Sequence, residues 1–221
     1  MGRWATFDCY GTLIDWEQGL ADALGRLWPD QDRGQLLATY HRHERSLEAP
    51  GPRPYREVLA LATRGIAAEI GLDLAPGAEK ALPSSLPHWS PFPEVADALA
   101  RLRADGWRLA VLSNVDPDLL AASLRLIGVP VDMTVTVAEA GSYKPAHGHW
   151  RTFFERTGAS PARHVHVAAS LFHDIVPCAQ LGLQAVWINR SGSVSEMIRA
   201  AELPDCAALP ETLAACIPAG R

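Results

Sequence analysis

The segment Trp4-Ala5-Thr6-Phe7-Asp8-Cys9-Tyr10-Gly11-Thr12-Leu13-Ile14-Asp15 decides the fold prediction for this chain. Its apolar start, residues 4–7, predicts a short buried strand. Asp8 follows this strand directly, and Gly11 then breaks the pattern. In open α/β sheets the ligand crevice lies beyond the carboxyl ends of the strands, so Asp8 is a candidate nucleophile. The alternative is that Asp8 only caps a turn, where Asp is common. The segment alone does not distinguish these two roles.

Composition excludes several classes of protein. Hydrophobic residues make up 48% of the 221 residues and charged residues 20%, which is typical of a globular protein with a sizeable core. The formal net charge of −5 argues against non-specific nucleic-acid binding, which needs a concentrated basic surface. No apolar run approaches the length of a membrane span, and no basic, apolar leader precedes the first strand. The four cysteines show no metal-type spacing, which is typical of free thiols in a reducing compartment. We therefore expect a cytoplasmic protein that binds neither nucleic acid nor membrane.

Residues 16–89 differ from what flanks them, because their apolar positions recur at helical spacing and no strand pattern is convincing. One stripe is Leu20, Leu24 and Leu27, and a second runs over 58–70 and ends at Gly71. A polar helix over 35–48 lies between them, followed by a Pro/Gly break at 50–52, and the Pro- and Ser-rich residues 83–93 indicate a linker. We expect 16–89 to form an all-helical insertion, with 1–15 and 90–221 forming the main domain.

From Glu94 onward the patterns of helix and strand alternate. The predicted strands are 109–112, 134–137, 165–168 and 185–188, and the predicted helices between them are 117–126, 148–157 and 176–181. Repeated strand–helix–strand units are typical of a doubly wound parallel sheet, so the expected class is α/β. Small or polar residues follow the strands, among them Ser113-Asn114 and Ser170, and we expect them at the same sheet edge as Asp8.

Four segments therefore meet at this edge: 8–12, Ser113-Asn114, Lys144-Pro145 and 170–174. Their order, an Asp, a Ser, a Lys and a further acid, resembles the four motifs of the haloacid dehalogenase superfamily. The resemblance covers nearly the whole chain, including the position of the helical insertion after the first motif. It implies a Rossmann-like core carrying a helical cap and a hydrolase that acts on a small molecule. Whether the protein forms a homodimer is left open.

The resemblance also implies a role for each motif. Asp8 resembles the family's nucleophile, which forms an aspartyl ester that water then hydrolyses. Lys144 resembles the cation that steadies this carboxylate. Ser113 and Asn114 resemble the pair that holds the departing group, and Asp174 stands in the position of the last acid.

Two departures from the phosphatase branch favour a member that needs no metal. Phosphatases have an Asp two residues after the nucleophile, where this chain has Tyr10, which does not readily exchange a proton at neutral pH. They also have Gly-Asp in motif four, where the Asp binds Mg²⁺; this chain has Ala168-Ala169. A hard cation requires several oxygen ligands, usually with more than one carboxylate.

The segment Asp8-Cys9-Tyr10-Gly11-Thr12 matches the Asp-x-Tyr-Gly-Thr motif of the type II (S)-2-haloacid dehalogenases. This branch implies displacement of halide, or a similar group, from a small 2-substituted carboxylic acid, with no cofactor. Two alternatives stay open. One is a phosphatase of small metabolites that holds Mg²⁺ through Asp8 and Asp174, and the other is a non-catalytic binding protein of the same fold.

The dehalogenase branch implies further site residues. Thr12 and Lys144 would orient Asp8, and Asn114 with a cap arginine would cradle the halide. The family has its arginine in a Trp-Arg pair where this chain has Tyr40-His41, so Arg42 and Arg45 are the candidates. The other candidate substrate contacts are Tyr10, Ser170 and His173, and His173 is also a candidate base or orienter for water.

Other positions are less informative. Motif four has Leu171 where the family has the Asn that positions the hydrolytic water. We expect His147 and His149 to be exposed to solvent. His164 and His166 show no acidic partner in the sequence pattern.

Overall fold

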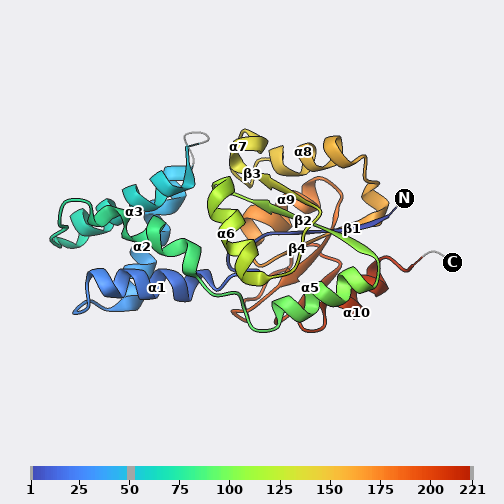
Figure 1. Cartoon of the computed structure of the whole chain (residues 1–221), viewed down its shortest axis with the longest axis horizontal. Helices are drawn as coiled ribbons and strands as arrows, with labels where there is room; N and C mark the ends of the chain where they lie inside the picture. The colour runs from blue at the N-terminus through green and yellow to red at the C-terminus, as the bar shows by residue number, and fades with distance from the viewer. Residues whose placement is uncertain (1, 49–52, 220–221) are drawn as a thin grey trace.

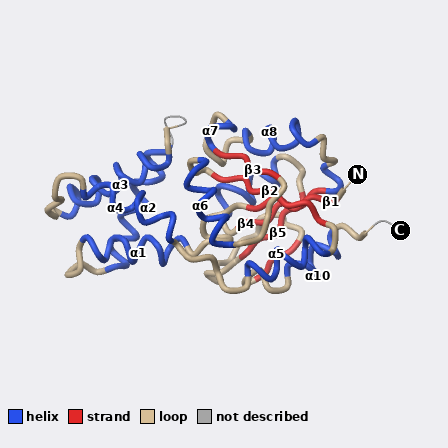
Figure 2. Tube along the Cα trace, viewed as in Figure 1, coloured by secondary structure: helices blue, strands red, loops and turns tan. Residues whose placement is uncertain are grey.

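The computed structural model describes residues 2–48 and 53–219, so the predicted break at 50–52 lies outside the described residues. Its centre is a six-stranded sheet in which every paired strand is parallel, with the order β3-β2-β1-β4-β5-β6 (Figure 2). The strands are β1 (Arg3–Phe7), β2 (Trp107–Ser113), β3 (Met133–Thr136), β4 (His164–Ala168), β5 (Gln184–Ile188) and β6 (Ala201–Leu203). The predicted α/β class is confirmed.

The strand order determines where a ligand can bind. From β1 the chain winds outward through β2 and β3, and then returns to place β4 on the other side of β1. The carboxyl ends of β1 and β4 therefore border the crevice at which such sheets bind ligands. The amide of Asp8 donates to the Val167 carbonyl at 3.0 Å, which extends the β1–β4 pairing by one residue. Asp8 is thus held at the rim of this crevice.

Helices cover both faces of the sheet (Figure 1). On one face lie α5 (Val95–Ala104) and α10 (Leu209–Cys216), and on the other α8 (Gly148–Thr157) and α9 (Val176–Gln180). Residues of β2 alternate between the two apolar clusters, with Leu109 and Val111 in one and Ala110 and Leu112 in the other. Strands buried on both faces need nearly continuous apolar sequence, which is why these strands were predictable.

Between residues 16 and 88, every regular element that the structure describes is a helix, and these helices lie together at one end of the molecule (Figure 1, left). We call this part the cap and the remainder the core. Its helices are α1 (Trp16–Leu27), α2 (Arg33–Glu48), α3 (Tyr55–Ile70) and α4 (Ala81–Ser85), with the short turns η1 (Ala78–Lys80) and η2 (Leu86–His88). The Asp15 side chain caps α1 by accepting from the Gln18 amide, and α3 ends at Gly71 with φ of +70°.

Three local predictions need correction. The linker predicted over 83–93 is helical in its first part, because Leu82 and Leu86 are fully buried and prolines are tolerated in first helical turns. The strand predicted to reach Val137 ends at Thr136, where a capping box with Glu139 starts α7 (Val137–Ala140). Strand β6 and helix α10 were not predicted, since three partly exposed residues give β6 no apolar run.

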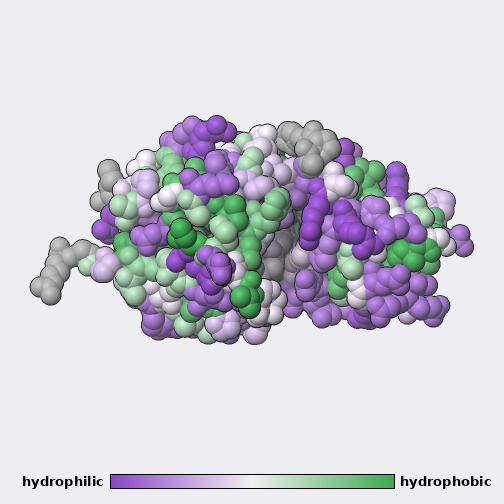
Figure 3. Space-filling view, turned by 180° about the vertical axis from the view of Figure 1, so that it is seen from behind, coloured by the Kyte–Doolittle hydropathy of each residue, from purple (hydrophilic) through white to green (hydrophobic). Residues whose placement is uncertain are grey.

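The core helix α6 (Pro117–Ile127) packs against η2 of the cap. Seen from behind, the cap surface is mostly hydrophilic, and a hollow separates it from the core (Figure 3). In the described ranges, no helix has both the length and the apolar character needed to cross a membrane.

Candidate active site

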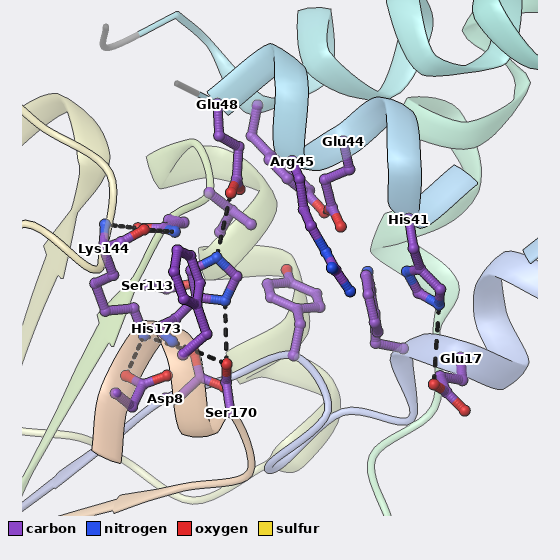
Figure 4. Close-up of a pocket in the computed structure, with 17 residues that line it drawn as sticks. Asp8, Glu17, His41, Glu44, Arg45, Glu48, Ser113, Lys144, Ser170 and His173 are labelled. Carbon is purple, nitrogen blue, oxygen red and sulfur yellow. Dashed lines mark hydrogen bonds and ion pairs between the residues drawn. The ribbon is translucent and has the colours of Figure 1, made fainter. Parts of the chain in front are cut away.

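A cavity of about 540 Å³ lies between the cap and the carboxyl ends of the strands (Figure 4). Side chains from the core form one wall: Asp8, Tyr10, Ser113, Asn114, Val115, Lys144, Ser170, Phe172, His173 and Asp174. Side chains from the cap form the other: Trp16, Glu17, His41, Glu44, Arg45, Glu48 and Tyr55. The cavity therefore brings together all the candidate residues predicted from the sequence except Thr12 and Arg42.

The carboxylate of Asp8 is held by both of its oxygens. Lys144 Nζ donates to Oδ1 at 2.8 Å and the Thr12 hydroxyl donates to Oδ2 at 2.8 Å. The Thr12 oxygen in turn accepts from the Ala169 amide at 2.9 Å. Gly11 has φ of +85°, a conformation that favours glycine, and this tight turn brings Thr12 back beneath Asp8. The nucleophile candidate is therefore fixed in position but retains lone pairs.

Lys144 is only 1% exposed and lies between two carboxylates. Besides Asp8, its Nζ donates to Asp174 Oδ1 at 2.7 Å and to the Leu112 carbonyl at 2.9 Å. Burial alone would lower the pKa of Lys144, but Asp174 and Asp8 outweigh burial and raise it. Burial would likewise raise the pKa of Asp174, but Lys144 and His166 lower it well below its ordinary value. The three groups form a buried charged unit with one positive and two negative charges.

The loop after β2 positions this lysine. The Asn114 side chain accepts from the Lys144 amide at 2.7 Å and donates to the Lys144 carbonyl at 3.1 Å. One N–H of the Asn114 amide thus remains for a ligand. The carbonyl of Ser113 accepts from His149 Nε2 at 3.0 Å. His149 is fully buried, so the expected solvent exposure is wrong; burial and then Lys144 lower its pKa to about 4.

A buried chain of hydrogen bonds under the site was not predicted. His166 Nε2 lies 2.9 Å from Asp174 Oδ1, and its Nδ1 lies 2.8 Å from the Thr6 hydroxyl. Thr6 is also 2.8 Å from His164 Nε2. Because the carboxylate accepts only, His166 donates to Asp174 from Nε2, and the Thr6 hydroxyl bridges the two histidines. The expectation that His166 has no acidic partner is therefore wrong.

The loop after β4 joins the core to the cap. Residues 171–175 form one π-helical turn whose start is capped by Ser170, which accepts from the His173 amide at 3.0 Å. His173 Nδ1 lies 3.1 Å from the Ser170 hydroxyl, and its Nε2 lies 3.3 Å from Glu48 of the cap (Figure 4). Burial lowers the pKa of His173, but pairing with Glu48 outweighs burial and the net shift is upward.

Helix α2 supplies most of the cap wall. Its pocket-lining residues His41, Glu44, Arg45 and Glu48 are spaced as one helix face. Figure 4 shows Arg45 extended into the pocket. Arg42 is a correction: its guanidinium turns away, is 58% exposed and pairs with Glu69, so it does not reach the site.

Glu44 is the most buried charged group of this face, at 8% exposure. Its Oε1 accepts from the hydroxyls of Tyr40 at 2.9 Å and Tyr55 at 2.6 Å. Burial and the neighbouring Glu48 raise the pKa of Glu44 to about 7. Sequence reasoning searched α2 only for an arginine; the i, i+3, i+4, i+7 spacing of charged residues was the signal available for the rest.

The donor set beside Asp8 does not fit a divalent cation. In the described ranges, no group of three or more His, Cys, Asp or Glu side chains is arranged to hold a metal ion. The ammonium of Lys144 stands directly between Asp8 and Asp174, where a cation held by both would need to be. Ala169, at the position of a phosphatase carboxylate, supplies no side-chain oxygen.

Comparison with known proteins places this geometry in context. A family model described as haloacid dehalogenase-like hydrolase matches residues 3–182. The chain is 29% identical over 195 residues to haloacetate dehalogenase H-2 of Moraxella sp. (strain B), covering 84% of this chain and 85% of that one. It is 26% identical over 206 residues to (S)-2-haloacid dehalogenase 4A of Burkholderia cepacia, covering 88% and 86%. The crystal structure of the L-2-haloacid dehalogenase RSc1362 superposes with a TM-score of 0.85 at 26% identity, covering 96% of this chain and 98% of that one.

Proposed function

The chain belongs to the haloacid dehalogenase-like hydrolases, and we propose that it hydrolyses a carbon–halogen or similar bond in a small 2-substituted carboxylic acid without a metal ion. The observation that carries this proposal is the Asp8 carboxylate, held by Lys144 and Thr12 at the open end of β1. The names of the relatives, which are haloacetate and 2-haloacid dehalogenases, support the same substrate class. As part of the proposal, residues 16–89 act as the cap domain, and 1–15 with 90–221 as the core domain.

In the first step, an oxygen of Asp8 attacks carbon 2 of the substrate. A C–O bond forms, the C–X bond breaks, and halide leaves with the electron pair. Lys144 and Thr12 hold the carboxylate for this attack, which requires no proton transfer to the leaving group. The phenol of Tyr10 fits this chemistry, because burial raises its pKa and keeps it protonated. Its hydroxyl bonds to Ser123 at 2.8 Å, and the side chain forms part of the pocket wall.

The departing and anchoring groups need donors. The remaining N–H of Asn114 and the guanidinium of Arg45, both in the pocket wall, are placed to receive the halide. The hydroxyl of Ser113 lies in the same wall and is available to the substrate carboxylate. These assignments support a substrate that has a carboxylate and, on the neighbouring carbon, a group that departs as halide.

In the second step, water attacks the ester carbonyl carbon of Asp8. The bond from this carbon to the bridging oxygen breaks, so the oxygen that Asp8 supplied in the first step leaves as the hydroxyl of the 2-hydroxy acid, and Asp8 keeps one oxygen from water. The proton of the attacking water passes by way of Asp174 Oδ2, which is buried in the pocket wall without a partner among the described residues, to the oxygen of the leaving 2-hydroxy acid. Lys144 and His166 hold the other oxygen of Asp174, so its orientation is fixed.

The test is chloride release from 2-chloropropanoate by the native chain and by Asp8→Asn, each assayed with Mg²⁺ and with a chelator. Release is expected only from the native chain, at the same rate in both buffers. Mass spectrometry after rapid acid quench should find the substrate skeleton attached to Asp8. The matched control is Asp15→Asn, which removes an acid of the same loop that only caps α1. Release by Asp8→Asn would refute the ester mechanism. Phosphate release that requires Mg²⁺ would indicate the phosphatase alternative, and no turnover of either class would indicate a binding protein.

A further inference from the structure

The cap wall contains a carboxylate oxygen that the reaction proposed above does not use. Glu44 is 8% exposed, and its Oε1 already accepts two tyrosine hydroxyls. No described residue donates to its Oε2, although Glu44 lines the pocket. Because Oε2 is not among the fully buried polar atoms, it is open to the cavity and can accept a hydrogen bond from a donor on a ligand.

The size of the cavity points the same way. A volume of about 540 Å³ is in the range that accommodates drug-sized ligands, whereas a three-carbon haloacid is far smaller. The additional space is bordered by four polar or charged side chains of α2, His41, Glu44, Arg45 and Glu48, and also by the aromatic side chains of Trp16, Tyr55 and Phe172. An alkyl group placed against Glu44 would displace water from the carboxylate and offer no hydrogen bond in return.

Resting on the function proposed above, we propose that Glu44 is a specificity-determining residue and that the substrate carries a hydroxyl group on the side chain that faces α2. The carboxylate and the reacting carbon stay with the core, and the hydroxyl donates to Glu44 Oε2. The tyrosine pair supports this role, because Tyr40 and Tyr55 hold Oε1 from two different cap helices and thereby fix the direction of the free oxygen.

A neutral donor fits this wall better than a cationic one. Arg45 lines the same wall, is exposed to the cavity, and has no ion-pair partner among the described residues. An ammonium group on the substrate would pair with the Glu44 carboxylate but would be repelled by the Arg45 guanidinium. A hydroxyl gains the hydrogen bond without that repulsion.

The closing experiment compares two isosteric substrates, 2-chloro-3-hydroxypropanoate and 2-chlorobutanoate, which differ by a hydroxyl in place of a methyl group. For the native chain, kcat/KM should favour the hydroxy acid by about tenfold, the equivalent of one hydrogen bond to the carboxylate. Glu44→Leu should abolish this preference while still releasing chloride from 2-chlorobutanoate. Should Glu44→Leu fail to fold, Glu44→Gln keeps an oxygen for both tyrosines and should still reduce the preference.

Two further measurements separate this inference from the reaction on which it rests. The control Glu17→Leu removes a pocket-lining acid whose side chain is 70% exposed, and should leave the substrate ratio unchanged. Calorimetric binding of 3-hydroxypropanoate and butanoate needs no reaction, so a Glu44-dependent preference for the former supports the inference even if no chloro acid is turned over. A native chain that discriminates in neither turnover nor binding overturns it, as does a preference that survives in Glu44→Leu.

Discussion

The core wall and the cap wall of the pocket differ in how far the charged side chains within each wall pair with one another. On the core side, Asp8, Lys144 and Asp174 are bound together at 2.7–2.8 Å and are almost completely buried. On the cap side, Arg45 has no ion-pair partner among the described residues, and His41 lies 4.0 Å from the exposed Glu17. A charge that is already paired can hold a reacting group in place, whereas an unpaired charge is free to select a ligand. We infer that the core wall performs the chemistry and the cap wall chooses the substrate.

The largest expected effect on the core wall comes from replacing Lys144. Lys144→Met leaves two carboxylates facing each other in a buried site, and breaking a buried pair in this way costs about 3–5 kcal/mol. We therefore expect a fall of that size in the free energy of unfolding at pH 7, measured in urea, together with at least a ~10²-fold loss of kcat. Lys80→Met is the matched control, because it replaces the chain's other lysine, which is exposed.

The pH dependence of that loss gives a second measure. In the native chain the pKa of Asp174 is lowered, so its ionised form adds stability above the ordinary carboxyl range near pH 4 and loses it at lower pH. Without Lys144, burial raises this pKa, and the charged carboxylate opposes folding at neutral pH. The stability gap between native chain and variant should therefore narrow from pH 7 to pH 4.5. A gap that stays constant would mean that the lysine acts only through packing.

The sequence predicts the core wall of the site better than the cap wall. Asp8, Ser113 and Asp174 come from the ends of strands or the loops after them, and parallel strands bring all such residues to one edge. The sequence was therefore sufficient to place the reacting groups together. Lys144 was expected at the same edge although its loop follows no predicted strand end directly, and the family resemblance gave it a role.

The cap residues of the site and the contact of His166 were not predictable, because they depend on the rotation of α2 about its axis and on how the loop after β4 folds. Helix α2 is mostly polar, so its sequence does not show which of its charged residues meet the core, and Arg42 and Arg45 point only about 60° apart around its axis. His166 looked like an ordinary strand residue. It reaches Asp174 only because the π-helical turn after β4 folds that acid back over the strand.

A second prediction concerns the contact that sets the cap against the core. The first turn of α3 follows Pro54, which offers no side-chain cap, and Asp116 of the core takes that role. It accepts from the amides of Tyr55 at 3.2 Å and Arg56 at 2.9 Å. Asp116→Ala should lower the free energy of unfolding by about 1–2 kcal/mol, as loss of a helix cap does, and raise KM more than it lowers kcat.

Hydrogen exchange at the Tyr55 and Arg56 amides checks the location of that effect, since both should lose protection. The control is Asp118→Ala, which removes a neighbouring acid that also bonds to Arg56 but has a 68% exposed side chain. Its effect should stay within about 0.5 kcal/mol. Equal effects of the two substitutions would show that Asp116 contributes only surface charge, and that the cap is held elsewhere.

The smallest expected effect comes from the contact between Glu48 and His173, where the two walls meet. Pairing raises the pKa of His173 in the folded protein, so this contact adds stability below the unfolded value near 6.5 and loses it as pH rises through the folded pKa. Glu48→Gln should therefore lower the free energy of unfolding by about 0.5–1 kcal/mol at pH 6 and by little at pH 9.

Glu44 acts in the same direction, because removing the Glu48 charge lowers the raised pKa of Glu44 and favours the variant at high pH. Among the other charges near His173, Asp174 also raises its pKa, whereas Lys144 lowers it. Urea unfolding at both pH values measures the difference, with Glu57→Gln as control, since its partner Arg53 keeps its charge throughout. A loss of stability that persists at pH 9 would mean that stabilisation by Glu48 does not depend on the charge of His173. Glu48 would then belong with the paired groups of the core wall rather than with the cap wall.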